Sequence, residues 1–181
     1  MLIPLEIIDL SKTYDSKEAV QNISFKVNQN EIIGILGPNG CGKTTTIGMI
    51  LGLLKPTKGK VLINGKEIEI YREDLLNELN FISPYVELPK RLTVKQNLEV
   101  FGRLYDVKKL KIKIDYLCEK LRLNEFIDKV TGELSSGQKN RVSLAKSIIN
   151  DPSVLLLDEP TASLDPETGD FVRSFLEEYQ K

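Results

Sequence analysis

The sequence of 181 residues predicts a single-domain α/β fold, and three observations lead to this prediction. A glycine-rich run, Gly37–Thr44, directly follows the apolar stretch Glu31–Leu36, as a loop does between a strand and a helix. The continuous apolar run Val154–Leu157 is typical of a strand covered on both faces. Between about residues 92 and 150 the spacing of apolar residues is helical.

The first part of the chain predicts strands. Short apolar runs at Leu5–Ile8, Ile23–Val27 and Ile32–Leu36 are separated by polar turns, and the last of them leads into the glycine-rich run. Further along, Val61–Ile63 is followed by the dipeptide Asn64-Gly65, which is a hairpin signal.

The middle of the chain predicts a second, mostly helical lobe. Its apolar residues recur at helical spacing on shared faces. The residues concerned are Val94, Leu98, Phe101, Leu117, Leu121, Val142, Ala145 and Ile149. The dipeptide Asp151-Pro152 is expected to end the last of these helices, because the residue before a proline disfavours helical geometry.

The composition argues against several classes of protein. Lysine plus arginine (25) nearly balance aspartate plus glutamate (26), so no overall field draws the chain to nucleic acid or an anionic membrane. Cys41 and Cys118 form neither a disulfide framework nor a metal-ligand pattern, and reduced cytosolic thiols are expected. The start lacks a signal peptide and no segment approaches ~18 continuous apolar residues, so we expect the chain not to cross a membrane.

The glycine-rich run matches the phosphate-loop pattern G-x-x-x-x-G-K-[ST] at every fixed position. Its glycines let backbone N–H groups wrap a polyanion, and the next helix points its positive end at the phosphates. Lys43 is expected between the β- and γ-phosphates, Thr44 on a Mg²⁺ ion and Thr45 on the α-phosphate. The complete predicted loop is Gly37, Pro38, Asn39, Gly40, Cys41, Gly42, Lys43, Thr44 and Thr45. The alternative is a glycine-rich turn before an ordinary helix.

Two adjacent carboxylates follow the apolar run Val154–Leu157, at the strand end where open α/β sheets bind ligands. Asp158 is expected to hold Mg²⁺, and Glu159 to polarise the attacking water as general base. The alternative, a pair of acids opening a surface turn before Pro160, is less favoured beside a phosphate loop.

A second anion site is predicted at Leu134–Gln138, which opens a helix with a serine hydroxyl and free N–H groups at its positive end. One nucleotide does not need two such sites on one lobe. The arrangement is explained if two chains meet head to tail, so that Ser135, Gly137 and Gln138 of one close on the γ-phosphate bound by the other. Taken alone, Ser135 would be an ordinary helix N-cap.

These motifs, in this order, resemble the ATPase subunit of ATP-binding-cassette (ABC) transporters over the whole chain. The resemblance implies a P-loop NTPase with a RecA-like parallel sheet core, an N-terminal antiparallel β portion and an inserted helical subdomain. Residues 1–82 and 151–181 would form the ATP-binding core, and about 83–150 the helical subdomain.

The resemblance also assigns roles to residues. Tyr14 matches the aromatic residue that stacks on adenine, residues 134–138 match the signature with Ser136 where glycine is usual, and Ser163–Asp165 matches a loop that communicates across the dimer. The implied cofactors are ATP and Mg²⁺. The implied catalytic residues are Lys43, Glu159 and the partner's Ser135.

The partners implied are a second ABC ATPase subunit, the same or different, and separate transmembrane permease subunits, with no nucleic acid. The chain would then be cytoplasmic and peripheral on the inner face of the cell membrane. Short stretches resemble subunits of exporters. The alternatives are a soluble ABC-type ATPase in DNA repair or translation, or a truncated fragment that does not hydrolyse ATP.

Two departures from the family pattern limit the comparison. The family's glutamine is expected near Ser83 and Pro84, and Gln96 lies too far along the chain to replace it. The family also has a further strand that ends in a histidine, whereas this sequence has no histidine and ends at Lys181. The resemblance therefore suggests a C-terminally truncated subunit with an open sheet, which would bind nucleotide poorly or fold poorly, and would hydrolyse ATP slowly if at all.

Overall fold

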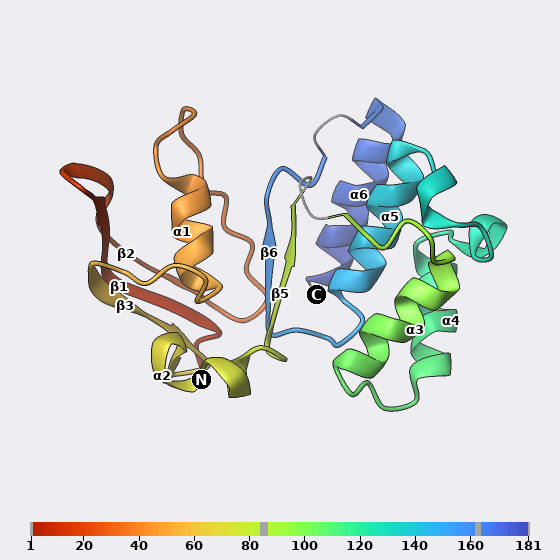
Figure 1. Cartoon of the computed structure of the whole chain (residues 1–181), viewed down its shortest axis with the longest axis horizontal. Coiled ribbons are helices and arrows are strands. Elements are labelled where there is room, and N and C mark those ends of the chain that lie inside the picture. The colour runs from red at the N-terminus through yellow and green to blue at the C-terminus, as the bar shows by residue number, and fades with distance from the viewer. Residues whose placement is uncertain (1, 84–86, 162–163, 181) are drawn as a thin grey trace. The chain divides into compact units, whose positions relative to one another are not determined.

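The structure is a computed structural model that describes residues 2–83, 87–161 and 164–180 (Figure 1). The chain divides into two compact units. The first contains the residues up to Leu79 together with Gln180, and the second spans Asn80–Tyr179. Each unit is described separately.

The first unit contains an antiparallel sheet. Its strands are β1 (Leu5–Tyr14), β2 (Lys17–Val27), β3 (Lys58–Ile63) and β4 (Lys66–Glu67), in the order β2-β1-β3-β4. The predicted strands at 5–8 and 23–27 are confirmed, although both are longer than their apolar runs. The predicted hairpin is also confirmed, because β3 and β4 are joined at Asn64-Gly65, where both residues have positive φ.

Alternation of side chains decides which face of β1 is buried. Leu5 and Ile7 are buried and pair with Val27 and Phe25 of β2. The register then shifts between Ile7 and Leu10, so that Leu10, rather than a residue at even spacing from Ile7, is the next buried side chain. A bulge of this kind bends the strand and moves the alternation by one position.

Two helices accompany this sheet, α1 (Lys43–Ile50) and α2 (Ile68–Leu75). Ile47, Met49 and Ile50 of α1 are buried, whereas α2 buries only its two ends and has a non-helical residue at Tyr71. Figure 1 shows α1 directly following the loop that carries the phosphate-loop pattern. The loop therefore lies at a helix N-terminus, as predicted.

The predicted strand at Ile32–Leu36 does not form. Residues 31–38 belong to no strand or helix, and the apolar side chains there are exposed, with Ile32 at 60% and Leu36 at 94%. An extended segment becomes a strand only when a neighbour supplies hydrogen bonds to its backbone. The prediction was wrong because an apolar run shows only that a segment could form a strand. It does not provide the neighbouring strand with which that segment would pair.

The second unit contains a two-stranded sheet of β5 (Leu79–Ile82) and β6 (Val154–Leu157). The pairing continues past β6, since the Asp158 N–H donates to the Ile82 carbonyl over 2.9 Å. The predicted strand at 154–157 is confirmed. The prediction that both faces of this strand are covered is wrong, because only Val154 is buried and the next three residues are partly exposed.

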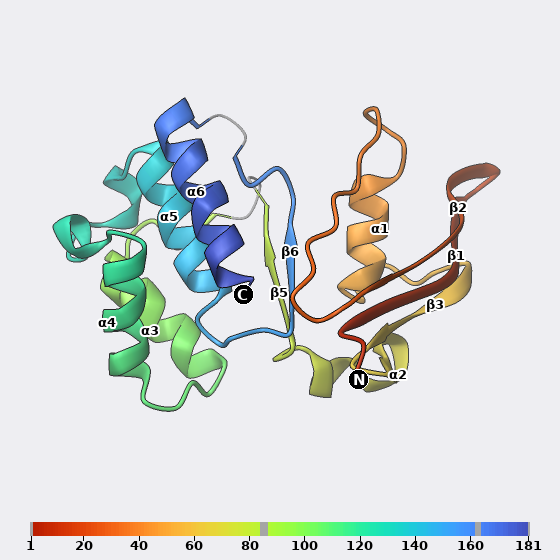
Figure 2. The same cartoon turned by 180° about the vertical axis from the view of Figure 1, so that it is seen from behind.

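Helices make up most of the second unit. They are α3 (Val94–Leu104), α4 (Leu110–Lys120), α5 (Ser136–Ser147), α6 (Pro166–Tyr179) and the short 3₁₀ helices η1 (Asn124–Phe126) and η2 (Thr131–Glu133). Helices α3, α4 and α5 confirm the helical spacing predicted between about residues 92 and 150. Figure 2 shows α3 to α6 together on one side of β5 and β6. Helix α5 ends at Ser147, before Asp151-Pro152, and a turn from Ile148 to Asp151 leads on to β6.

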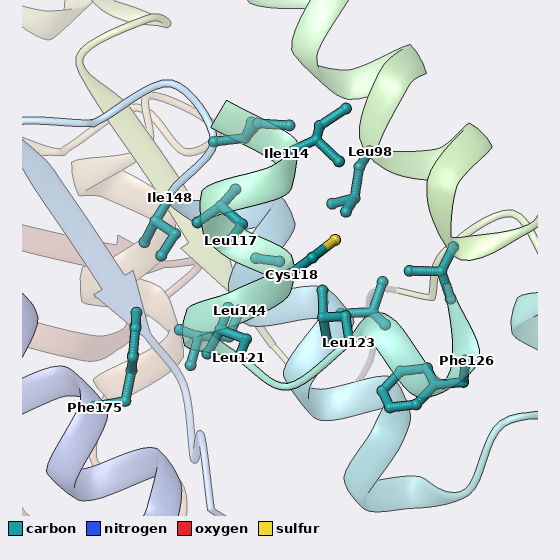
Figure 3. Close-up of a cluster of buried hydrophobic side chains, with 14 of the residues drawn as sticks. Leu98, Ile114, Leu117, Cys118, Leu121, Leu123, Phe126, Leu144, Ile148 and Phe175 are labelled. Carbon is teal, nitrogen blue, oxygen red and sulfur yellow. The ribbon is translucent and has the colours of Figure 1, made fainter. Parts of the chain in front are cut away.

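The core of the second unit lies among these helices (Figure 3). Leu98 of α3, Leu117 of α4 and Leu144 of α5 are at most 1% exposed and belong to one cluster, which Phe175 of α6 joins. Burial of such side chains contributes about 1.5–3 kcal/mol each. Among the helices described, none combines the length and the apolar character needed to span a bilayer.

Candidate nucleotide site

The predicted site residues fall in both units. The phosphate loop and Tyr14 lie in the first unit, and the carboxylate pair and the signature lie in the second. The residues of each unit are therefore described separately.

The phosphate loop has the backbone that its glycines predict. Gly40 and Gly42 have φ of 81° and 96°, in the left-handed region that favours glycine. Gly42 is also the N-cap of α1, and a Cβ there would lie 2.2 Å from the backbone oxygen of Ala19. A side chain at position 42 is thus excluded by conformation and by space. The contact also shows that the end of the loop packs on strand β2.

The Lys43 ammonium lies over its own loop. Its Nζ donates to the Gly37 carbonyl over 2.7 Å and to the Pro38 carbonyl over 3.0 Å. Those two bonds hold a positive charge at the mouth of the loop, beside the first N–H groups of α1. Thr44, the next residue, is exposed, and Thr45 is half-buried. The structure thus gathers a cation, a hydroxyl and a helix N-terminus in one place, which is the chemistry that binds phosphate.

Tyr14 ends strand β1 and is 44% exposed. It pairs with Lys17 at the end of the β1–β2 hairpin, the same hairpin whose Ala19 contacts the end of the phosphate loop. The Lys12 ammonium lies 5.0 Å from the centre of the Tyr14 ring. An exposed aromatic ring at the end of a hairpin can stack on a flat base.

The carboxylate pair lies at the end of β6, as predicted. Asp158 is partly exposed and fixed by its backbone bond to Ile82, whereas Glu159 is exposed. Glu159 has φ of 50°, a left-handed conformation that residues other than glycine seldom adopt. No pattern of residues around Glu159 predicts this backbone conformation.

The signature forms the start of α5. Ser135 is the N-cap, its hydroxyl oxygen accepts from the Gln138 N–H, and the Gln138 side chain accepts from the Ser135 N–H. Both residues therefore form the capping box that an N-cap interpretation predicts. Ser135 still has a hydroxyl hydrogen to donate, and it lies exposed at the positive end of a helix.

Gly137 lies against the start of α6. A Cβ at Gly137 would lie 3.2 Å from the Thr168 side chain. Thr168 in turn donates from both its backbone N–H and its hydroxyl to the Asp165 carboxylate, over 2.9 and 2.7 Å. These bonds hold the pKa of Asp165 below its usual value. Asp165 belongs to the predicted dimer loop, whose Ser163 lies outside the described residues.

A cavity of about 340 Å³ joins the carboxylate turn to the signature helix within the second unit. Asp158 and Glu159 line it from β6, and Ser136 and Asn140 line it from α5. Glu87 and Lys90, which form an ion pair of 2.7 Å, line it from the segment before α3. Apolar side chains, among them Ile82, Leu88 and Leu164, complete its lining.

Two further expectations concern Mg²⁺ and its sensing. In the described ranges no three cysteine or acidic side chains gather as a metal cluster. The two predicted Mg²⁺ ligands, Thr44 and Asp158, lie in different units. Gln96 forms a capping box with Thr93 at the start of α3, so its side-chain oxygen already accepts a hydrogen bond from the Thr93 N–H. Ser83 directly follows β5 and is buried, and Pro84 lies outside the described residues.

Sequence reasoning missed the asparagines that organise the second unit. Asn140 donates to the Pro160 carbonyl over 2.8 Å, next to Glu159. Asn97 is fully buried and donates to the Thr93 carbonyl over 3.0 Å. Helical periodicity identifies buried apolar positions and does not identify buried amide side chains. No signal in the sequence therefore indicated either residue.

Comparisons with known proteins agree with these motifs. A family model described as "ABC transporter" matches residues 20–162. "Nod factor export ATP-binding protein I" of Rhizobium sp. (strain N33) is 37% identical over 166 residues, which cover 91% of this chain and 55% of that protein. The protein of the same name in Burkholderia pseudomallei (strain 1710b) has the same identity and coverage. The chain thus spans about half the length of these curated relatives.

Solved structures agree as well. CbiO1 from Clostridium perfringens, described as part of the ABC transporter complex cbiONQ, is 31% identical with a TM-score of 0.87, and covers 99% of this chain and 74% of that one. An ATP-binding subunit of an ABC transporter is 26% identical with a TM-score of 0.88, at 99% and 75% coverage. The expected fold class, an α/β P-loop NTPase, is confirmed. The chain belongs to the ABC transporter family.

Proposed function

We propose that the chain binds ATP with Mg²⁺ and hydrolyses it, as the subunit that energises transport through separate membrane-spanning subunits. The observation that carries the proposal is the phosphate loop: left-handed glycines, a lysine held at the loop mouth and an exposed threonine at a helix N-terminus. On binding, the Lys43 ammonium exchanges the Gly37 and Pro38 carbonyls for phosphate oxygens. Tyr14 stacks on the adenine.

The other site residues bind the phosphates, hold Mg²⁺ and accept a proton from water. The loop from Gly37 to Gly42 donates backbone N–H groups to the phosphates, Thr45 contacts the α-phosphate, and Thr44 and Asp158 supply oxygen ligands for Mg²⁺. Glu159 accepts a proton from the attacking water. In this arrangement residues 1–82 and 151–181 act as the ATP-binding core, and residues 83–150 as the helical subdomain.

The signature supports a head-to-tail pair of subunits. Ser135 has its oxygen occupied by the Gln138 N–H and its hydrogen available, at the positive end of α5. An anion bound by Ser135, Gly137 and Gln138 would be the γ-phosphate of the second subunit's ATP. The second subunit is either another copy of this chain or a related ATPase.

The transport role is supported by relatives rather than by the site. The Nod factor relatives are named for export, and CbiO1 is named as part of a larger transporter complex. We therefore propose that this chain acts with separate membrane-spanning subunits, that transport is in the export direction, and that the chain lies on the inner face of the membrane.

A second candidate is a chain that binds nucleotide without turning it over. The observation in its favour is the exposed apolar run Ile32–Leu36, which precedes the phosphate loop without a strand neighbour. A loop anchored on one side only, at α1, holds its lysine less rigidly than catalysis requires.

Calorimetric titration of Mg-ATP tests binding, with Lys43→Ala as the loss variant and Lys111→Ala, at an exposed position, as the control for removing one charge. Hydrolysis measured in Glu159→Gln tests catalysis. The proposal expects Lys43→Ala to lose binding and Glu159→Gln to bind normally but turn over at least ~100-fold more slowly. Equal binding by Lys43→Ala and the unchanged chain would refute it. Normal binding without any turnover would select the second candidate.

A further inference from the structure

The backbone at Glu159 needs support from its surroundings. Its φ of 50° is left-handed, and such a conformation persists in a residue with a side chain only where the surroundings impose it. The next residue, Pro160, restricts the residue before it and has no N–H with which to close a turn. The support must therefore come from groups outside the turn.

Two hydrogen bonds hold the backbone one residue before and one residue after Glu159. Before it, the Asp158 N–H donates to the Ile82 carbonyl over 2.9 Å, which continues the pairing of β5 with β6. After it, the side-chain nitrogen of Asn140 donates to the Pro160 carbonyl over 2.8 Å. The first bond belongs to the sheet. The second comes from a side chain twenty positions away in the chain.

Asn140 is well placed to hold this turn. It lies on α5 between Ser136 and Ser143, four residues after one and three before the other, and all three line the cavity that Glu159 also lines. Both Asn140 and Pro160 are partly buried, so water competes poorly for their hydrogen bond. Helix α5 is itself fixed at its start by the Ser135 capping box.

We propose that Asn140 is a positioning residue that holds the Glu159 turn in its left-handed conformation and so aims the carboxylate at the attacking water. The inference rests on the proposed function, in which Glu159 is the general base. Asn140 itself touches neither nucleotide nor water in this role. Without its amide, the Pro160 carbonyl loses its hydrogen bond, the left-handed turn at Glu159 relaxes and the carboxylate leaves its catalytic position.

The test compares three variants of the full chain. Asn140→Leu keeps a similar volume without the donor, Asn140→Gln keeps an amide, and Asn124→Leu makes the same change at an exposed position. We expect Asn140→Leu to slow single-turnover hydrolysis about 10- to 100-fold, since small displacements of a catalytic group have effects of this size. The Kd for Mg-ATP should stay within about twofold, because the phosphate loop is unchanged. Asn140→Gln should recover part of the rate.

Hydrogen exchange gives a readout that does not need turnover. Asn140→Leu should speed exchange of the amides of Asp158, Glu159 and Thr161, while Asn124→Leu should leave them unchanged. Unchanged exchange at these three amides in Asn140→Leu would overturn the proposal, even with hydrolysis too slow to measure. A loss of hydrolysis that merely follows the folded fraction, measured by thermal unfolding, would overturn it too.

Failure of this inference is distinguishable from failure of the proposed function. Slow hydrolysis in Glu159→Gln with normal hydrolysis in Asn140→Leu would refute only the role of Asn140. Normal hydrolysis in Glu159→Gln would refute the catalytic role of Glu159, and the positioning role with it.

Discussion

The side-chain nitrogen of Asn97 lies 3.4 Å from the hydroxyl oxygen of Thr131, and the two residues are 0% and 2% exposed. Both also donate to the Pro89 carbonyl, Thr131 over 2.7 Å. Backbone bonds continue the link, since Thr131 N–H donates to the Leu92 carbonyl. This buried clasp joins the segment before α3 to the segment that leads into Ser135, and Thr131 itself lines the cavity.

Removing either half of the clasp should destabilise the protein. In Asn97→Leu or Thr131→Val, the carbonyls of Pro89 and Leu92 lose a donor that comes from a buried side chain, and each lost hydrogen bond costs about 0.5–1.5 kcal/mol. Chemical denaturation should report losses in this range, larger for Asn97→Leu. The double variant should lose less than the sum, because the residues share acceptors. A midpoint for Asn97→Leu equal to that of the exposed control Asn124→Leu would show that the clasp does not contribute.

Gly42 should be the least replaceable glycine of the phosphate loop. In Gly42→Ala the Cβ meets the Ala19 oxygen at 2.2 Å and φ is unfavourable, whereas in Gly40→Ala only φ is unfavourable. Left-handed geometry alone costs about 1–2 kcal/mol. We expect Gly42→Ala to exceed this loss and to abolish ATP binding. Gly34→Ala, with open space and no positive φ, is the control. Equal losses at positions 40 and 42 would contradict the packing of the loop on β2.

Ser135 can be tested separately as a helix cap and as an anion ligand. Ser135→Ala removes the cap and should cost about 1 kcal/mol, whereas Ser135→Asp supplies another preferred cap residue and should retain stability. Facing a phosphate, however, the aspartate carboxylate is repulsive. We expect Ser135→Asp to melt normally yet lose ATP-driven association of two subunits, measured by light scattering with Glu159→Gln as the background. Association that survives in this variant would exclude Ser135 as a γ-phosphate ligand.

The sequence was informative where local chemistry decides the structure. The phosphate loop, the N-cap at Ser135 and the hairpin at Asn64-Gly65 each depend on residues within one turn of the chain, and all three formed as predicted. The strand at Ile32–Leu36 depends on a neighbour elsewhere, and it did not form. Asn97 and Asn140 make contacts that no periodicity encodes. Local motifs were therefore predictable, and pairing and buried polar contacts were not.

The exposure of the Ile32–Leu36 run leads to a prediction of its own. Leu36 is 94% exposed, so Leu36→Lys should change the free energy of unfolding by no more than about 0.5 kcal/mol. Leu98→Lys, at a fully buried position, is the positive control and should prevent folding. If Leu36→Lys destabilised the chain by several kcal/mol, the run would have to be buried against a neighbour in solution.

Tyr179 should make stability depend on alkaline pH. Burial, with smaller contributions from Asp151 and Tyr116, raises the pKa of its phenol from 10.0 to about 12. Between these two values the unfolded chain releases the proton and the folded chain keeps it, so the free energy of unfolding falls as the pH rises. Because the phenol is partly exposed, we expect a loss of about 1–2 kcal/mol rather than the full value of the shift.

Urea denaturation of the unchanged chain and of Tyr179→Phe, from pH 9 to pH 12, measures this contribution. Phenylalanine keeps the stacking on Phe175, whose ring centre lies 6.0 Å away, and has no proton to lose. The variant should therefore lose less stability than the unchanged chain over this range, while below pH 9 the difference between them should be constant. Tyr71→Phe removes an exposed phenol and serves as the control. Parallel curves for Tyr179→Phe and the unchanged chain would mean that the phenol of Tyr179 ionises equally in the folded and unfolded states.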